Sequence, residues 1–206
     1  VILTNYQFYV EEFVRMAQGI MQPTDDPQLR TYRSQYKCLV EPGGYTTPNG
    51  NLSSGAPTGA RAERLPQMPA YHLVADNASG ITIINIGVGP ANAKTITDHL
   101  AVIRPHAWIM LGHCAGLRES QKLGDYVLAH AYVRDDHVLD ADLPSWVPVP
   151  ALAEIQQALA TAVADVTGTH GYDTKTVMRT GTVVTTDNRN WELLGYRNLV
   201  ERFSQS

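Results

Sequence analysis

The sequence contains few cysteines and no long apolar run. Its 206 residues include two cysteines, Cys38 and Cys114, and no Cys-x-x-Cys pair. A disulfide framework or a structural zinc site is therefore not expected. The low cysteine content instead predicts a reducing, cytoplasmic location. No apolar stretch approaches the roughly 20 residues that a membrane-spanning helix needs, so no membrane partner is expected.

The sequence also lacks a strong charge and several common catalytic motifs. Its net charge is −4 and its pI about 5.9, which argues against a protein that binds nucleic acid. Gly-x-Ser-x-Gly, a Walker loop and His-Glu-x-x-His are absent, which removes the main support for the common hydrolase, NTPase and zinc-protease classes. With 44% hydrophobic residues, the chain is long enough to form one large domain with a core.

Apolar runs alternate with helical periodicities along the chain. This alternation predicts an α/β fold with a mostly parallel sheet covered on both faces, plus one antiparallel hairpin. The segment 41–60, rich in glycine and proline, is interpreted as a mobile surface loop or lid rather than a strand. Strands are expected at 1–4, 71–75, 81–86, 107–111, 126–132 and 177–184, and helices at 6–18, 91–103, 151–166 and from 190 to the end. For the first helix, Asn5 is the expected N-cap and Gly19 the expected end.

Small and polar residues follow several of the predicted strands. They occupy Leu111–Ser120, Ile86–Pro90 and Val184–Asp187. Open α/β sheets bind small ligands at the carboxyl ends of their strands, because the loops there leave a crevice with free backbone N–H groups. The pattern therefore predicts a ligand pocket.

The glycines and the histidine–cysteine pair have alternative interpretations. Gly87–Asn92 resembles a dinucleotide fingerprint only in part, because Asn92 replaces the third glycine. It forms either a tight turn that a ligand approaches or a turn without a ligand. His113 and Cys114 are adjacent, and on an extended segment they point to opposite faces. A shared metal or thiol centre is therefore disfavoured, and His113 is expected to face the pocket with Cys114 buried behind it.

Two polar clusters are likewise open to more than one use. Arg134–His137 with Asp140 suits a divalent cation, a solvated loop with an internal ion pair, or a subunit interface, and the last two are favoured. Thr185–Trp191 has two interpretations. It could bind a planar heterocycle, with polar groups hydrogen-bonded to the ring edges and the Trp191 indole packed on the ring face, or it could form the capped start of a helix.

Six longer segments carry a further signal: 87–95, 112–120, 124–132, 134–140, 179–187 and 189–192. Together they resemble the purine nucleoside phosphorylase-like (nucleoside phosphorylase-I) family, and within it the AMP nucleosidases. The resemblance covers nearly the whole chain and is weakest over 20–66. It implies a three-layer α/β/α sandwich around a mixed, partly barrel-like sheet. It further implies hydrolysis of AMP to adenine and ribose 5-phosphate, and a homo-oligomer, a dimer or a hexamer. No cofactor and no metal are expected.

The resemblance also implies roles for individual residues. Val88 falls at a ribose contact, Asn5 at a strand end that helps phosphorylases to bind phosphate, and Asn190 with Trp191 at the base. Phosphorylases carry arginines at the places of Tyr9 and Met110, and their absence favours water as the nucleophile. The predicted substrate-binding residues are Asn5, Gly87, Val88, Gly89, His113, Cys114, Thr186, Asp187, Asn190 and Trp191, with His113, Arg118 and Arg134 as candidates for the 5′-phosphate.

The chain is expected to be a piece of a longer polypeptide, because it opens on Val1 and stops at Ser206 without an evident cause. We interpret residues 1–206 as a single catalytic-type domain, incomplete at its C-terminal end and without a regulatory N-terminal domain. The resemblance places the general acid, an aspartate, beyond Ser206, so no catalytic residue is assigned within the chain and little glycosidase activity is expected of it alone. The alternatives are a shortened, non-catalytic nucleotide-binding relative and a nucleoside phosphorylase.

Overall fold

The computed structural model describes residues 1–77, 79–144, 147, 149–188, 190–193 and 195–204. The chain forms two compact units. The first contains Val1–Val88 and Thr95–Gly112, and the second contains Gly89–Lys94 and His113–Ser206. The interpretation of residues 1–206 as one domain stays a prediction.

The first unit is built on a six-stranded mixed sheet with the order β3-β2-β4-β5-β1-β6. The strand β1 pairs in parallel with β5 and β6, and the other pairings are antiparallel. The prediction of a mostly parallel sheet is wrong here, since short turns join β2 to β3 and β4 to β5, and a parallel pair needs a long crossover. The elements are β1 (Ile2–Thr4), α1 (Gln7–Met21), α2 (Pro27–Arg33), β2 (Tyr36–Val40), β3 (Thr46–Pro48), β4 (Ala70–Ala75), β5 (Gly80–Asn85) and β6 (Ile109–Leu111), and α3 (Pro90–Ile103) begins in the second unit and ends in the first.

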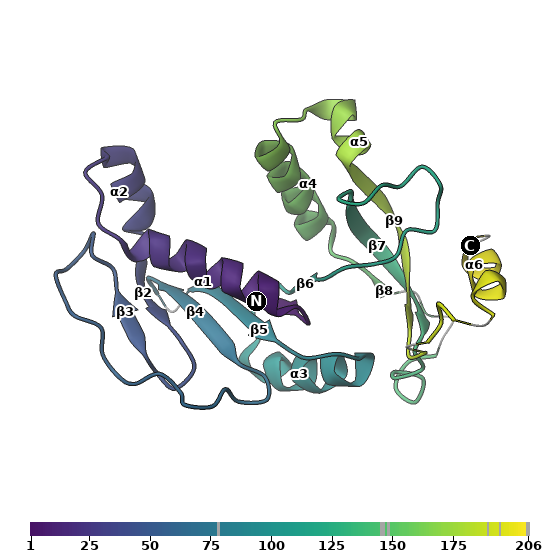
Figure 1. The fold of residues 1–206 in the computed structure, drawn as a ribbon, viewed down its shortest axis with the longest axis horizontal. Helices are drawn as coiled ribbons and strands as arrows, with labels where there is room; N and C mark the ends of the chain where they lie inside the picture. The colour runs from purple at the N-terminus through teal and green to yellow at the C-terminus, as the bar shows by residue number, and fades with distance from the viewer. Residues whose placement is uncertain (78, 145–146, 148, 189, 194, 205–206) are drawn as a thin grey trace. The chain divides into compact units, whose positions relative to one another are not determined.

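Helix α1 packs along this sheet and supplies much of its core (Figure 1). Ala17 and Met21 pack with Leu39 and Leu73, all nearly inaccessible to solvent. A second cluster joins Val10 to the sheet through Tyr71 and Ile83. Burying such side chains stabilises the unit by roughly 1.5–3 kcal/mol each.

The ends of α1 differ from those predicted. Tyr6, not Asn5, is the N-cap residue, and its side chain makes no capping hydrogen bond. The helix passes Gly19 and continues to Met21, because Met21 completes the core cluster with β2 and β4. Both predicted boundaries were therefore wrong by a few residues.

The segment 41–60 is not the strandless loop that its composition predicted. Thr46–Pro48 form β3, which pairs with β2. Asn49 follows directly and is almost completely buried. The segment is therefore fastened to the sheet by strand pairing and by a buried amide, and the glycines form turns around this anchor.

The second unit holds a three-stranded sheet with the order β8-β7-β9. Strands β7 and β9 run parallel, and α4, η1 and α5 lie between them in the chain. Helix α4 ends at Gly168, whose φ of 68° gives a left-handed C-cap that favours glycine. The elements are β7 (Tyr126–Asp135), β8 (Val149–Pro150), α4 (Ala153–Thr167), η1 (Gly171–Asp173), α5 (Thr174–Val177), β9 (Met178–Thr186) and α6 (Tyr196–Ser204).

The expected α/β class with mixed sheets is confirmed, and within the described residues neither sheet closes into a barrel. In the part of the chain that the structure describes, no helix is both long and apolar enough to cross a membrane.

His72 on β4 gives the first unit a pH-dependent stability. Its Nδ1 lies 2.9 Å from Thr82 Oγ1, and burial lowers the pKa of the imidazole below its usual value of about 6.5. The unfolded chain then binds more protons than the folded one, so the contribution is present above about pH 6.5 and is lost as the pH falls further. We expect the free energy of unfolding, measured in urea, to fall more steeply with acid for the wild type than for His72→Gln. Parallel pH profiles would contradict this assignment.

Candidate functional site

The carboxyl ends of β5, β1 and β6 lie at one edge of the first unit's sheet. Thr4 is the register partner of both Asn85 and Leu111, so the three strands end level with one another. The backbone N–H of Ile86 donates to Thr4 O at 2.8 Å, which continues the ladder past the end of β5. Two of the three strand ends predicted to form a pocket, those of β5 and β6, thus lie on either side of the end of β1.

The residues that follow these strands leave the backbone accessible. Gly87 has a φ of 70°, in the region that favours glycine, and its N–H donates to Asn85 Oδ1 at 3.0 Å. Val88 is 60% exposed. A Cβ built at Gly112 would lie 3.5 Å from Asn5 Oδ1, so the Asn5 side chain faces the Gly112 backbone. This edge can therefore receive a ligand close to the main chain.

Gly89 lies where the chain passes into the second unit. Its φ is 108°, and its carbonyl accepts from the N–H of Ala93 at 3.3 Å, in the first turn of α3. This is a tight strand-to-helix turn, as expected. Whether a ligand approaches it stays a prediction.

The loop after Gly112 is irregular and exposed. His113, Cys114 and Arg118 are all exposed, and Cys114 is a free thiol. The prediction that Cys114 is buried is wrong, because β6 ends at Leu111 and the alternation of a strand does not continue into the loop. Ser120 O accepts from Arg179 Nη2 at 3.0 Å, which ties the end of this loop to β9.

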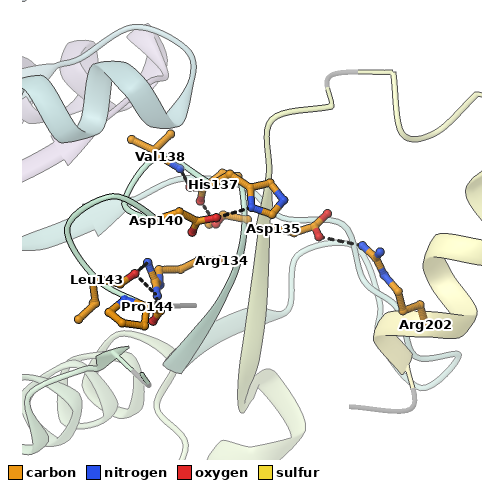
Figure 2. A network of polar contacts seen from close by, with 10 residues as sticks. Arg134, Asp135, His137, Val138, Asp140, Leu143, Pro144 and Arg202 are labelled. Atoms are coloured by element: carbon orange, nitrogen blue, oxygen red, sulfur yellow. Dashed lines mark hydrogen bonds and ion pairs between the residues drawn. The ribbon is translucent and has the colours of Figure 1, made fainter. Parts of the chain in front are cut away.

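Three consecutive charged residues, the last two of β7 and the one after it, each contact a different segment, and Figure 2 labels the first two, Arg134 and Asp135. Arg134 donates from Nη2 to Pro144 O at 2.7 Å. Asp135 accepts from Arg202 Nη2 at 2.9 Å, which fixes α6. Asp136 accepts from the hydroxyl of Thr185 on β9. The Arg134 guanidinium therefore binds backbone carbonyls here, and its predicted contact to a 5′-phosphate stays untested.

The turn after β7 is closed by a histidine–carboxylate pair. His137 Nδ1 lies 2.7 Å from Asp140 Oδ2, and Figure 2 shows the two side chains directed toward one another. This hydrogen bond and the charge of Asp140 raise the pKa of His137. Among the described residues no group of three or more His, Cys, Asp or Glu side chains could hold a metal ion. The solvated loop with internal ion pairs is what the structure contains.

The residues after β9 form a series of polar turns. Thr186 Oγ1 accepts from Asn188 N at 3.2 Å, and Asn188 Oδ1 accepts from Asn190 N at 3.0 Å. The backbone N–H of Trp191 donates to Asn188 O at 3.1 Å, and Trp191 is half-buried. The alternative of a capped helix start is wrong, since α6 begins only at Tyr196. Asp187 and Asn190 are exposed, and Arg189 lies outside the described residues.

The predicted site residues divide between the two units. Asn5, Gly87 and Val88 belong to the first, and the others belong to the second. The partnerships of Asp135 with Arg202 and of Asp136 with Thr185 were not predicted, although the charged run after β7 marked the place.

Most of the chain, residues 66–203, matches the family model described as "Phosphorylase superfamily". The chain belongs to the phosphorylase superfamily. Among its curated members, this chain is 52% identical over 193 residues to "AMP nucleosidase" of Escherichia coli strain K12. That match covers 94% of this chain and 38% of the relative, so the chain spans well under half the length of the curated relatives it matches.

Solved structures of this superfamily have the same fold. The AMP nucleosidase of Bacteroides thetaiotaomicron VPI-5482 matches with a TM-score of 0.62 at 27% identity, over 100% of this chain and 64% of that one. A purine nucleoside phosphorylase from Toxoplasma gondii, solved with immucillin-H, matches with a TM-score of 0.61 at 19% identity, over 99% of this chain and 63% of that one. The second likeness concerns the fold alone.

Proposed function

We propose that the protein containing this chain hydrolyses the N-glycosidic bond of AMP, giving adenine and ribose 5-phosphate. The observation that carries this proposal is the 52% identity to an AMP nucleosidase over 94% of the chain. The accessible glycine-rich strand ends in the first unit and the exposed polar turns after β9 are of the kind that bind small ligands.

Each unit, taken by itself, offers groups that suit a part of a nucleotide. Asn5, Gly87 and Val88 lie at one strand edge, where uncharged groups and main-chain amides suit a ribose. Thr186, Asp187, Asn190 and Trp191, together with Gly89, His113 and Cys114, complete the proposed set, and the Trp191 indole suits the purine face. Cleavage passes through an oxocarbenium-like sugar, so these groups must hold the ribose, orient a water and help the adenine to leave. The general acid is not assigned to a residue of this chain.

Water is the proposed nucleophile because cations are missing where phosphorylases carry them. Tyr9 lies in contact with the Phe8 ring, at a centroid distance of 5.3 Å, and Met110 is 50% exposed. Neither side chain can form the bidentate contacts by which arginine binds phosphate. His113, Arg118 and Arg134 remain candidates for the 5′-phosphate. We further propose a homo-oligomer, a dimer or a hexamer, that acts in the cytoplasm.

The proposal predicts a specific substrate and phosphate dependence. The full gene product should release adenine from AMP at a rate that does not need added inorganic phosphate, and adenosine should be a poorer substrate. Adenine release is followed by liquid chromatography, with and without phosphate. A requirement for phosphate would identify a nucleoside phosphorylase instead. Binding of AMP without turnover would identify a non-catalytic nucleotide-binding relative.

A further inference from the structure

The contact between Asp136 and Thr185 lies just before the segment proposed to bind the purine. We infer that Asp136, acting through Thr185, is a positioning residue that aims residues 186–188, 190 and 191 at the adenine ring. The inference rests on the proposed function, which supplies the purine.

The pairing of β7 with β9 brings the two residues together. In the parallel register Arg134 is opposite Thr185 and Asp135 is opposite Thr186, so the strands end side by side. Asp136, the first residue after β7, reaches across to the Thr185 hydroxyl, which must be the donor because a carboxylate only accepts. The second carboxylate oxygen, Oδ1, accepts from Val138 N at 3.0 Å. Both oxygens of the half-buried Asp136 are thus used, which fixes the carboxylate.

The turns after β9 begin at the residue next to this contact. Thr186 holds Asn188 through its hydroxyl, and Asn188 in turn holds Asn190 and Trp191. Each of these bonds spans only two or three residues, so together they keep the turn's own shape. They do not fix the direction in which the turn leaves the sheet.

The Thr185 hydroxyl supplies that direction. A hydrogen bond to a carboxylate is roughly twice as strong as a neutral one. Without it the turn keeps its internal bonds but is free to tilt where the chain leaves the ladder after Thr186, and the groups offered to the purine move together. Contacts to the sugar phosphate from other segments would not change. We therefore expect a loss of affinity for adenine alone, with the affinity for ribose 5-phosphate unchanged.

The test compares variants of the full gene product in binding to the two halves of the substrate. Thr185→Val removes the hydroxyl at nearly constant size, Thr185→Ser keeps it, and Asp136→Ala removes the acceptor. Thr182→Val is the matched control, because Thr182 is an exposed threonine of the same strand and has no side-chain hydrogen bond within the described residues. Affinities for adenine and for ribose 5-phosphate are measured separately by calorimetry.

We expect Thr185→Val and Asp136→Ala each to weaken adenine binding by about tenfold, with no further loss in the double variant. Affinity for ribose 5-phosphate should stay within about twofold of the wild type in all variants, and Thr185→Ser and Thr182→Val should bind adenine normally. Equal losses for both ligands, or unchanged adenine binding in Thr185→Val, would overturn the inference while leaving AMP hydrolysis established. A wild-type protein that neither binds adenine nor cleaves AMP would overturn the proposed function itself, and with it this inference.

Discussion

In the full gene product, whose proposed activity is AMP hydrolysis, replacing Gly112 by valine is expected to lower adenine release from AMP by about 100-fold while leaving the fold stable. Gly112 follows β6 at the same sheet edge as Asn5 and Gly87. Its φ lies outside the left-handed region, so its backbone accepts a side chain without strain. A Cβ there already lies 3.5 Å from Asn5 Oδ1, and the two methyl groups of valine would push against Asn5 and fill the space offered to the ribose.

Two measurements separate this effect from unfolding. The value of kcat/KM for AMP should fall in Gly112→Val, whereas the urea midpoint should stay close to that of the wild type. Gly112→Ala is the matched control, since its single methyl group makes only an ordinary contact, and its activity should stay within a few-fold of the wild type. Wild-type activity in Gly112→Val would show that substrate does not occupy this edge.

The largest loss of stability is expected at Asn49, whose side chain is 1% exposed. Its Nδ2 donates to Arg33 O at 2.8 Å and to Tyr36 O at 2.7 Å. Its Oδ1 accepts from the N–H and the Nδ2 of Asn51 at 2.9 and 2.8 Å. Asn51 in turn donates to Gln22 O at 2.8 Å, so this pair of amides joins β2, the end of α1 and the segment 41–60.

Asn49→Ala should therefore cost about 3–4 kcal/mol in the free energy of unfolding, because it leaves several buried polar groups without partners. Urea titration followed by circular dichroism measures the loss. Asn49→Asp should be destabilising too, since it keeps the size but removes both donors. Asn198→Ala, an exposed amide on α6, should stay within about 0.5 kcal/mol of the wild type. A loss below about 1 kcal/mol for Asn49→Ala would mean that this amide does not anchor the segment.

The parts of the fold that were predicted correctly are those with strong local signals. The hairpin of β4 and β5 and the helices α3 and α4 show clear apolar periodicity between turn residues. Helix α2 was missed because it has no buried residue and therefore no apolar face. Strand β3 was missed because its pairing with β2 and the buried Asn49 outweigh a composition typical of loops.

For the candidate site, too, the sequence predicted the positions that follow apolar runs but not the contacts between distant residues. Asn5 and Gly87 follow apolar runs, and parallel pairing with β1 puts them at one edge, as expected. Two contacts organise the end of β7, and each joins residues that are far apart in the sequence. Asp136 and Thr185 are separated by 49 positions, and Asp135 and Arg202 by 67, so no local pattern shows such partners. The exposure of Cys114 was missed because strand alternation was extended into a loop.

The source of the oxygen that joins the sugar decides between water and phosphate as the nucleophile. When the full gene product cleaves AMP in heavy-oxygen water with inorganic phosphate present, hydrolysis gives ribose 5-phosphate with one heavy oxygen at its anomeric carbon. A sugar phosphorylated at that carbon, with no oxygen taken from water, would rule out AMP hydrolysis.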